Sequence, residues 1–141
     1  MSENGRKALT KDFELARVLL VDDDIASRLT LKTVLEAGGY AVDSAASAAE
    51  AVGKLDERQY ELVLSDLQME SPEAGLQVLA HARLMDYKPA TAIVTTYKNR
   101  HPSVRRAVLI EPEDLPGLLT KVADLISQRA ARIVERQLRD M

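Results

Sequence analysis

Five short apolar segments recur along the chain, and their alternation with longer amphipathic segments constrains the fold more than any other feature. Each is only four to six residues long, which is typical of strands buried on both faces of a parallel sheet. They are Ala16–Val21, Tyr40–Asp43, Glu61–Leu64, Thr91–Val94 and Ala107–Ile110. Strands that alternate with helices predict a parallel sheet with helices on both faces. Because crossover connections are right-handed, we expect a doubly wound α/β fold.

Local signals indicate where the helices begin and end. Ser47 and Glu50 have the spacing of a capping box, whereas Pro72 and Gly75 favour a loop. The first helix has its apolar residues at Ile25, Leu29, Leu31, Val34 and Leu35, a broadly amphipathic pattern. The expected helices are Ile25–Ala37, a segment from Ser47 to Glu57, Leu76–Met85 and the long segment Pro112–Met141.

Length and composition indicate a globular domain. The chain has 141 residues, of which 46% are hydrophobic and 29% are charged, as is usual for a single soluble domain. The absence of cysteine excludes disulfides, thiolate metal sites and cysteine nucleophiles. It also fits a reducing compartment, so we expect a cytoplasmic protein.

Charge and hydropathy exclude several classes of partner. The net charge is −3 and the pI is about 5.4, so we expect no nucleic-acid binding by this chain alone. No segment approaches the roughly 20 apolar residues that span a bilayer, so we expect no membrane partner. Residues 1–15 are expected to form a flexible leader.

Acidic side chains follow two of the expected strands. Asp22, Asp23 and Asp24 end the first strand, Asp66 ends the third, and Thr95 ends the fourth. In doubly wound sheets, ligands bind beyond the carboxyl ends of the strands. If the first and third strands are neighbours, the carboxylates converge, and a hard cation such as Mg²⁺ would relieve their repulsion. A carboxylate beside Mg²⁺ can attack a phosphoryl group, to which the Thr95 hydroxyl could donate a hydrogen bond.

The three strand ends resemble one known family. The segments are Val18–Asp24, Leu62–Met69 and Ile93–Tyr97. Together they resemble the receiver domain of bacterial two-component response regulators, over about Arg17 to Gln128. The resemblance implies a flavodoxin-like, five-stranded parallel sheet of order 2-1-3-4-5. It also implies a signalling switch rather than a turnover enzyme.

The resemblance implies a role for each matching residue. Asp66 would accept a phosphoryl group from a histidine kinase or a phosphotransfer protein. Asp22, Asp23, the Asp66 side chain and the Gln68 backbone carbonyl would bind Mg²⁺. Thr95 would move toward the phosphoryl group and couple the site to the distal surface. Asp24 directly precedes a helix. For this residue, the alternative to a role in the acidic cluster is a negative charge that stabilises the helix N-terminus.

The sequence departs from the family pattern at four places. Glu111 stands where the family has a lysine that pairs with the phosphorylated aspartate, and a carboxylate about 5 Å away would instead repel it by roughly 3 kcal/mol at a dielectric of about 20. Val108 replaces the usual aromatic switch residue. The stretch from Thr95 to Glu111 is short, so we expect a shortened fourth helix. The loop Glu70–Glu73 is one residue longer than usual.

These departures leave alternatives open. Lys98 or Arg100 could replace the missing lysine and preserve phosphorylation. Alternatively, the chain is a pseudo-receiver that binds proteins independently of phosphorylation. A remote alternative is a phosphatase of the haloacid-dehalogenase type, which shares the Asp-x-Asp spacing of Asp22 and Asp24. Such phosphatases need a threonine shortly after that pair, where this chain has Ile25 and Ala26.

The last expected helix is longer than one sheet face requires. We therefore expect a receiver domain over residues 16–128 and a C-terminal helical extension over 129–141. The extension mixes charges with spaced alanine, isoleucine, valine and leucine. This pattern suits the interface of a homodimer or a linker to an output domain, with a frayed, solvated helix as the alternative.

Overall fold

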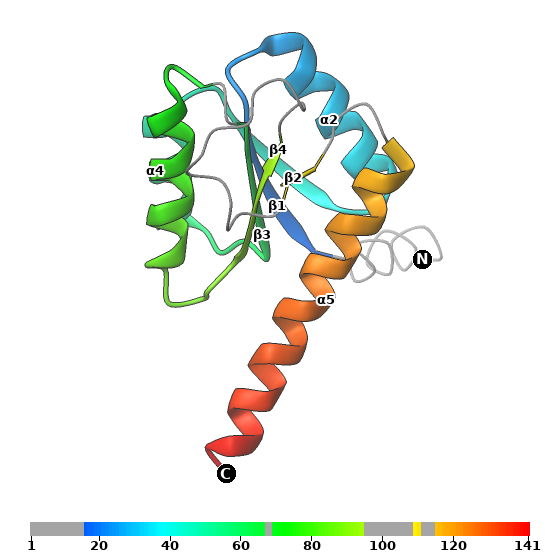
Figure 1. Cartoon of the computed structure of the whole chain (residues 1–141), viewed down its shortest axis with the longest axis vertical. Helices are drawn as coiled ribbons and strands as arrows, with labels where there is room; N and C mark the ends of the chain where they lie inside the picture. The colour runs from blue at the N-terminus through cyan, green and yellow to red at the C-terminus, as the bar shows by residue number, and fades with distance from the viewer. Residues whose placement is uncertain (1–15, 67–68, 95–108, 111–114) are drawn as a thin grey trace, which may run out of the picture.

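A computed structural model of the chain describes residues 16–66, 69–94, 109–110 and 115–141. Its strands form one sheet of order β2-β1-β3-β4-β5, in which every neighbouring pair is parallel (Figure 1). The strands are β1 (Arg17–Val21), β2 (Ala41–Ala45), β3 (Leu62–Asp66), β4 (Ala90–Val94) and β5 (Leu109–Ile110). The predicted doubly wound α/β fold and its strand order are confirmed.

Four helices lie within the described residues: α2 (Ile25–Ala37), α3 (Ala48–Glu57), α4 (Pro72–Arg83) and α5 (Leu115–Arg139). The long C-terminal helix is confirmed, because α5 has 25 residues. The leader expected over residues 1–15 and the shortened fourth helix expected after Thr95 lie outside the described residues.

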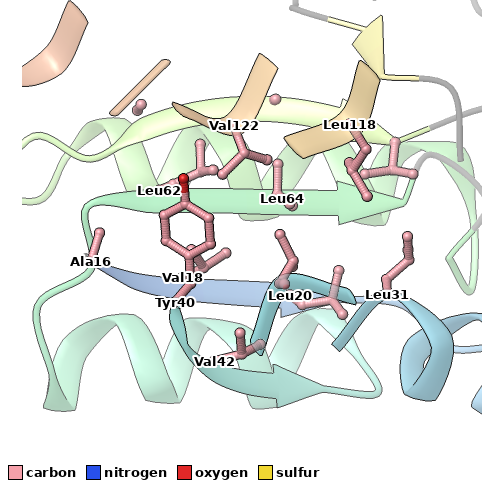
Figure 2. Packing of buried hydrophobic residues seen from close by; sticks show 14 residues of the cluster. Ala16, Val18, Leu20, Leu31, Tyr40, Val42, Leu62, Leu64, Leu118 and Val122 are labelled. Carbon is pink, nitrogen blue, oxygen red and sulfur yellow. The ribbon is translucent and has the colours of Figure 1, made fainter. Parts of the chain in front are cut away.

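Two apolar layers cover the two faces of the sheet. On one face, α2 and α5 pack on alternate strand residues; Figure 2 shows this cluster, which includes Val18, Leu20, Leu62, Leu64, Leu31, Leu118 and Val122. On the other face, α3 and α4 pack on the remaining strand residues. This second cluster includes Leu19, Val21 and Val63 from the strands and Ala51, Leu55, Val78 and Leu79 from the helices. The central strands are therefore buried on both sides, which explains why they lack a polar alternation.

The first helix buries fewer of its apolar residues than their number suggests. Leu31 and Leu35 are 4% and 0% exposed and pack on the sheet. Ile25 and Leu29 are 64% and 59% exposed. The amphipathic face of α2 is therefore narrower than the sequence pattern suggested, and its first two turns leave apolar side chains in solvent.

The third predicted helix, α4, begins at Pro72, four residues before the predicted start at Leu76. Ser71 is the N-cap of α4, and its Oγ accepts a hydrogen bond from the Ala74 amide at 3.2 Å. Pro72 occupies the first turn of the helix, where the missing amide hydrogen has no cost. The expectation of a loop containing Pro72 and Gly75 was wrong because serine followed by proline is a helix start.

The predicted capping box at the start of α3 is formed with a shifted partner. The Ser47 Oγ accepts from the Glu50 amide at 3.1 Å. The Glu50 carboxylate accepts from the amide of Ala46, at 3.1 Å, rather than from that of Ser47. Both ends of the box still satisfy amides at the helix entrance.

Arg129 fixes α5 to the edge of the domain. Its guanidinium donates to the carbonyl oxygens of Tyr87 and Lys88, at 2.6 and 2.9 Å. These carbonyls lie in the turn between α4 and β4, so the arginine joins two segments more than 40 residues apart in sequence. The C-terminal part of α5, coloured orange to red, extends beyond the rest of the domain (Figure 1).

Candidate metal-binding site

The candidate site lies at the carboxyl ends of β1 and β3, which are neighbours in the sheet. Val21 and Ser65 are register partners, so the next residues, Asp22 and Asp66, leave the two strands side by side. Asp22, Asp23 and Asp66 each offer one carboxylate oxygen, and these atoms all lie within 4.8 Å of one another. The structure therefore brings together the three carboxylates that the sequence indicated as metal ligands.

The three carboxylates differ in exposure. Asp22 is only 2% exposed, Asp66 is partly buried, and Asp23 is exposed. Burial raises the pKa of Asp22 to about 6, although the amide of Asp24 donates a hydrogen bond that favours its charged form. The negative charge of Asp66 contributes a smaller part of that increase. The site thus holds more negative charge than its surroundings stabilise, a condition that a bound cation would relieve.

Hydrogen bonds hold Asp22 in place. Its amide donates to the carbonyl oxygen of Ala45 in β2, at 3.0 Å. The Arg28 Nη1 donates to its carbonyl oxygen at 2.8 Å, and the Asp24 amide donates to its Oδ1 at 2.9 Å. Sequence patterns gave no indication of Arg28, because it looks like any other arginine on a helix surface.

Asp24 serves the helix rather than the carboxylate cluster. It is the N-cap of α2, and its Oδ2 accepts from the Ser27 amide at 2.9 Å. This is the alternative that the sequence offered for Asp24. The capping bond fixes the direction in which the chain leaves the cluster, since Asp24 contacts both Asp22 and the first turn of the helix.

Gly75 lets α4 approach the backbone of Asp66. A Cβ atom at this position would meet the Asp66 carbonyl oxygen at 2.6 Å and the Ser65 Oγ at 3.5 Å. The buried Ser65 hydroxyl donates to the same carbonyl oxygen at 3.3 Å. Sequence reasoning missed this role; the available signal was a glycine in the first turn of a helix, which indicates a close approach of two backbones.

Met69 and Glu70, which follow Asp66 in sequence, are held by contacts with the core and with α3. Met69 is 6% exposed and packs in the core beneath α3 and α4. The Glu70 carboxylate accepts from the Ala48 amide, at the N-terminus of α3, at 3.1 Å. Met69 is thereby tied to the core, and Glu70 to the neighbouring helix α3.

Three of the predicted site residues, Gln68, Thr95 and Glu111, lie outside the described residues. The end of β5 lies within the described residues and is in register with the end of β3. Ile110 pairs with Val94, and Val94 pairs with Asp66.

Comparison with known proteins decides the family. The sequence of residues 18–125 matches the family described as response regulator receiver domain. This chain belongs to that family. The receiver domain is a module of two-component signalling, and such domains generally act as switches rather than as turnover enzymes.

Solved receiver structures share the fold of this domain. A CheY-like receiver domain protein from Methanospirillum hungatei is 27% identical, with a TM-score of 0.68, and the match covers 84% of this chain and 98% of that chain. The response regulator TrrA from Thermotoga maritima, solved in complex with Mg²⁺ and BeF, is 27% identical, with a TM-score of 0.64 and coverage of 79% and 99%.

Curated relatives are longer proteins. The transcriptional regulatory protein GlrR of Escherichia coli is 33% identical over 109 residues, which cover 77% of this chain but 23% of GlrR. ResD of Bacillus subtilis is 37% identical over 78 residues, or 55% of this chain and 31% of ResD. The chain thus spans less than a third of either relative. Within the described ranges, no helix combines the length and the apolar composition that crossing a membrane requires.

Proposed function

We propose that this receiver domain is a Mg²⁺-dependent phosphoacceptor in a two-component phosphorelay, and that Asp66 receives the phosphoryl group. The observation that carries the proposal is the convergence of Asp22, Asp23 and Asp66 within 4.8 Å at the ends of β1 and β3. The donor would be a phosphohistidine on a histidine kinase or on a phosphotransfer protein. The predicted cytoplasmic location agrees with such a donor.

The chemistry of the cluster fits Mg²⁺. The three carboxylates are the hard oxygen ligands that Mg²⁺ prefers. The pKa of Asp22 is raised chiefly by burial, with the negative charge of Asp66 as a smaller cause. Asp22, Asp23 and Asp66 would hold the ion, with the Gln68 carbonyl as the proposed fourth protein ligand. When bound, the ion would neutralise phosphoryl oxygens during transfer.

The residues of the chain have distinct tasks in the proposed reaction. A carboxylate oxygen of Asp66 forms a bond to phosphorus while the bond from phosphorus to the donor imidazole breaks. The imidazole keeps the electron pair of that bond, and Asp66 becomes an acyl phosphate. Gly75 and Ser65 hold the backbone of Asp66, and Arg28 holds that of Asp22. Thr95 is proposed to donate its hydroxyl to the phosphoryl group.

A second candidate is a pseudo-receiver that binds proteins without being phosphorylated. The specific observation in its favour is Glu111, which follows β5 at the place where the family has a lysine. An ionised glutamate cannot donate a hydrogen bond to a phosphoryl group. Under the first function, Lys98 or Arg100 would have to supply the cation that replaces the missing lysine.

The deciding experiment is phosphorylation by a small donor. The wild type would be incubated with acetyl phosphate and Mg²⁺, and separately with beryllium fluoride and Mg²⁺, and followed by intact mass and by thermal unfolding. We expect the mass of one added phosphoryl group, and a raised melting temperature with beryllium fluoride. Asp66→Asn should show neither, whereas Asp24→Asn, which removes a neighbouring charge but keeps a capping oxygen, should show both.

The outcomes separate the candidates. An absence of any Asp66-dependent adduct or thermal shift would contradict the phosphoacceptor and favour the pseudo-receiver. Continuous turnover of a generic phosphate ester with Mg²⁺ would instead support the phosphatase alternative, since a switch is modified once and then must be reset.

A further inference from the structure

Helix α4 runs from the backbone of Asp66 to the turn that α5 contacts. Its first turn is seated on Asp66, because a Cβ atom at Gly75 would lie 2.6 Å from the Asp66 carbonyl oxygen. The helix has 12 residues and is therefore about 18 Å long. Its middle is fixed against the sheet, since Val78, Leu79 and Ala82 are 0%, 2% and 0% exposed. A shift at one end of α4 is therefore passed to the other end.

The turn that follows α4 contains a strained residue. Lys88 has a φ of 44°, in the left-handed region that residues other than glycine rarely adopt. Its ammonium group donates to the carbonyl oxygen of Arg83, the last residue of α4, at 2.9 Å. Its amide donates to the carbonyl oxygen of Met85 at 3.0 Å. Because a strained residue persists only where its surroundings hold it, the conformation of this turn depends on its contacts.

Arg129 of α5 holds the same turn from the other side. Its Nη2 and Nε donate to the carbonyl oxygens of Tyr87 and Lys88, and the planar guanidinium binds both at once. The Tyr87 hydroxyl donates to the carbonyl oxygen of Leu55 at 2.9 Å, so α3, α4 and α5 meet at this turn. We name Tyr87, Lys88 and Arg129 the α5 anchor. The turn lies at the end of the domain from which α5 extends (Figure 1).

Beyond the α5 anchor, the helix has little contact with the domain. Leu118 and Val122 are buried against the sheet, whereas Val134 and Leu138 are 52% and 64% exposed. The ease with which a segment opens is set by the contacts that must break. The α5 anchor therefore determines how firmly residues 130–139 are held to the domain.

We propose that α4 couples the Asp66 site to the α5 anchor, so that a ligand fixing the end of β3 also tightens the hold on the end of α5. The seat of Gly75 on Asp66 makes these two segments move together. At the other end of α4, relaxation of the left-handed Lys88 gives the turn a second arrangement, and both sites bias that equilibrium. Coupling is reciprocal, so an intact α5 anchor must also favour binding at Asp66. This regulation rests on the proposed phosphoacceptor function.

The first test needs no ligand. Gly75→Ala should displace the first turn of α4 and speed hydrogen exchange about fivefold in residues 84–90 and 126–139. Helix α2, which packs on the opposite face of the sheet from α4, is the internal reference for global stability. Gly53→Ala should leave exchange unchanged in both segments, because a Cβ atom there meets no heavy atom within 4 Å. Equal exchange of residues 126–139 in the two variants would overturn the coupling.

The second test adds Mg²⁺ and beryllium fluoride to the full chain. Binding should slow exchange in residues 126–139 about fivefold, at the lower end of the range for linked sites. Arg129→Gln should abolish this response and weaken Mg²⁺ binding in excess beryllium fluoride by the same factor, measured by calorimetry. Arg129→Lys keeps the charge but loses the planar fork and should behave similarly. Arg132→Gln removes the same charge at an exposed position and should change neither.

Failure of the coupling is distinguishable from failure of the proposed function. Absence of any binding of Mg²⁺ and beryllium fluoride would overturn the proposed function and this regulation with it. Binding that leaves exchange in residues 126–139 unchanged would overturn the coupling alone. Equal Mg²⁺ affinities for Arg129→Gln and Arg132→Gln would do the same, and the phosphoacceptor would stand.

Discussion

Gly75 and Asp66 are in backbone contact: a Cβ atom on Gly75 would lie 2.6 Å from the carbonyl oxygen of Asp66. Real Cβ atoms essentially never approach a neighbour so closely, so any other residue would move α4 or the end of β3. The first turn of α4 is therefore seated directly on the backbone of the proposed phosphoacceptor. The position of the Asp66 carboxylate depends on a residue nine positions further along the chain.

Gly75→Ala should lower both stability and metal affinity. Alanine favours a helix by up to about 1 kcal/mol relative to glycine, but the clash should cost about 1–3 kcal/mol and outweigh that gain. Urea unfolding would measure the stability, and a Mg²⁺ titration would measure the affinity.

Gly53→Ala is the matched control for Gly75→Ala. Gly53 lies within α3, and a Cβ atom there would meet no heavy atom within 4 Å. This variant should be stabilised by up to about 1 kcal/mol, with no change in Mg²⁺ affinity. If Gly75→Ala were as stable as Gly53→Ala, the close contact with Asp66 would not constrain the site.

The metal-free protein should lose stability as the pH rises through about 6. The pKa of Asp22 is raised from 3.8 to about 6, chiefly by burial, so folding favours the protonated form of this carboxyl group. Its stabilising contribution is complete below about pH 4 and is lost above the folded-state pKa, at a total of up to about 3 kcal/mol. Thermal or urea unfolding between pH 4 and 8, in a chelating buffer, would measure this dependence.

Asp22→Asn should flatten that pH profile and make the metal-free protein more stable at pH 8. Asparagine keeps an Oδ1 that can accept from the Asp24 amide, while the buried charge is removed. Mg²⁺ should stabilise the wild type at pH 8 but have little effect on this variant. Asp24→Asn removes a charge from the same loop and should change the profile much less. Identical pH profiles for the wild type and Asp22→Asn would refute the assignment of this pH dependence to Asp22.

Arg28→Ala should weaken Mg²⁺ binding by up to about tenfold, because residues that orient metal ligands commonly contribute that much. The arginine holds the Asp22 carbonyl oxygen at 2.8 Å, and its loss frees the loop that carries Asp22 and Asp23. Arg28→Lys should restore part of the affinity. Lys32→Ala, one turn further along α2, removes the same charge and controls for a purely electrostatic effect; an equal loss there would exclude a positioning role.

Exposed apolar residues on α2 should take part in docking of the phosphodonor protein. Ile25 and Leu29 lie on the first turns of the helix that Asp24 caps, beside the carboxylate cluster. Replacing both by alanine should slow transfer from a histidine kinase by about tenfold, the effect of losing about 1.4 kcal/mol of contact. Phosphorylation by acetyl phosphate should be unchanged, because that donor needs no protein surface.

Leu84→Ala is the control for the docking prediction. Leu84 is 73% exposed and follows the C-terminal end of α4, at the edge of the sheet opposite the carboxylates. This variant should accept phosphate from both donors as the wild type does. Slower transfer from both donors in the Ile25 and Leu29 variant would indicate a damaged site and contradict a docking role.

Local sequence patterns were enough to predict the order of strands and helices along the chain and the edge of the sheet at which the carboxylates gather. Apolar runs as short as Val18–Val21 and the Gly38 stop signal are local features, so they can be read without knowing the fold. Parallel strands then place the residues that follow them at one edge of the sheet. Asp22, Asp23 and Asp66 could be grouped on that ground, on the condition that the first and third strands are neighbours.

The contacts that hold this edge in place could not be predicted from local patterns. Three of these features depend on how the helices pack on the sheet. They are the burial of Asp22, the hydrogen bond from Arg28 to its carbonyl oxygen, and the close contact between Gly75 and Asp66. Local patterns also misplaced the start of α4 and overstated how much of α2 is buried. The physical reason is that period and capping signals act within a few residues, whereas burial, close approach and exposure depend on which surface each element meets.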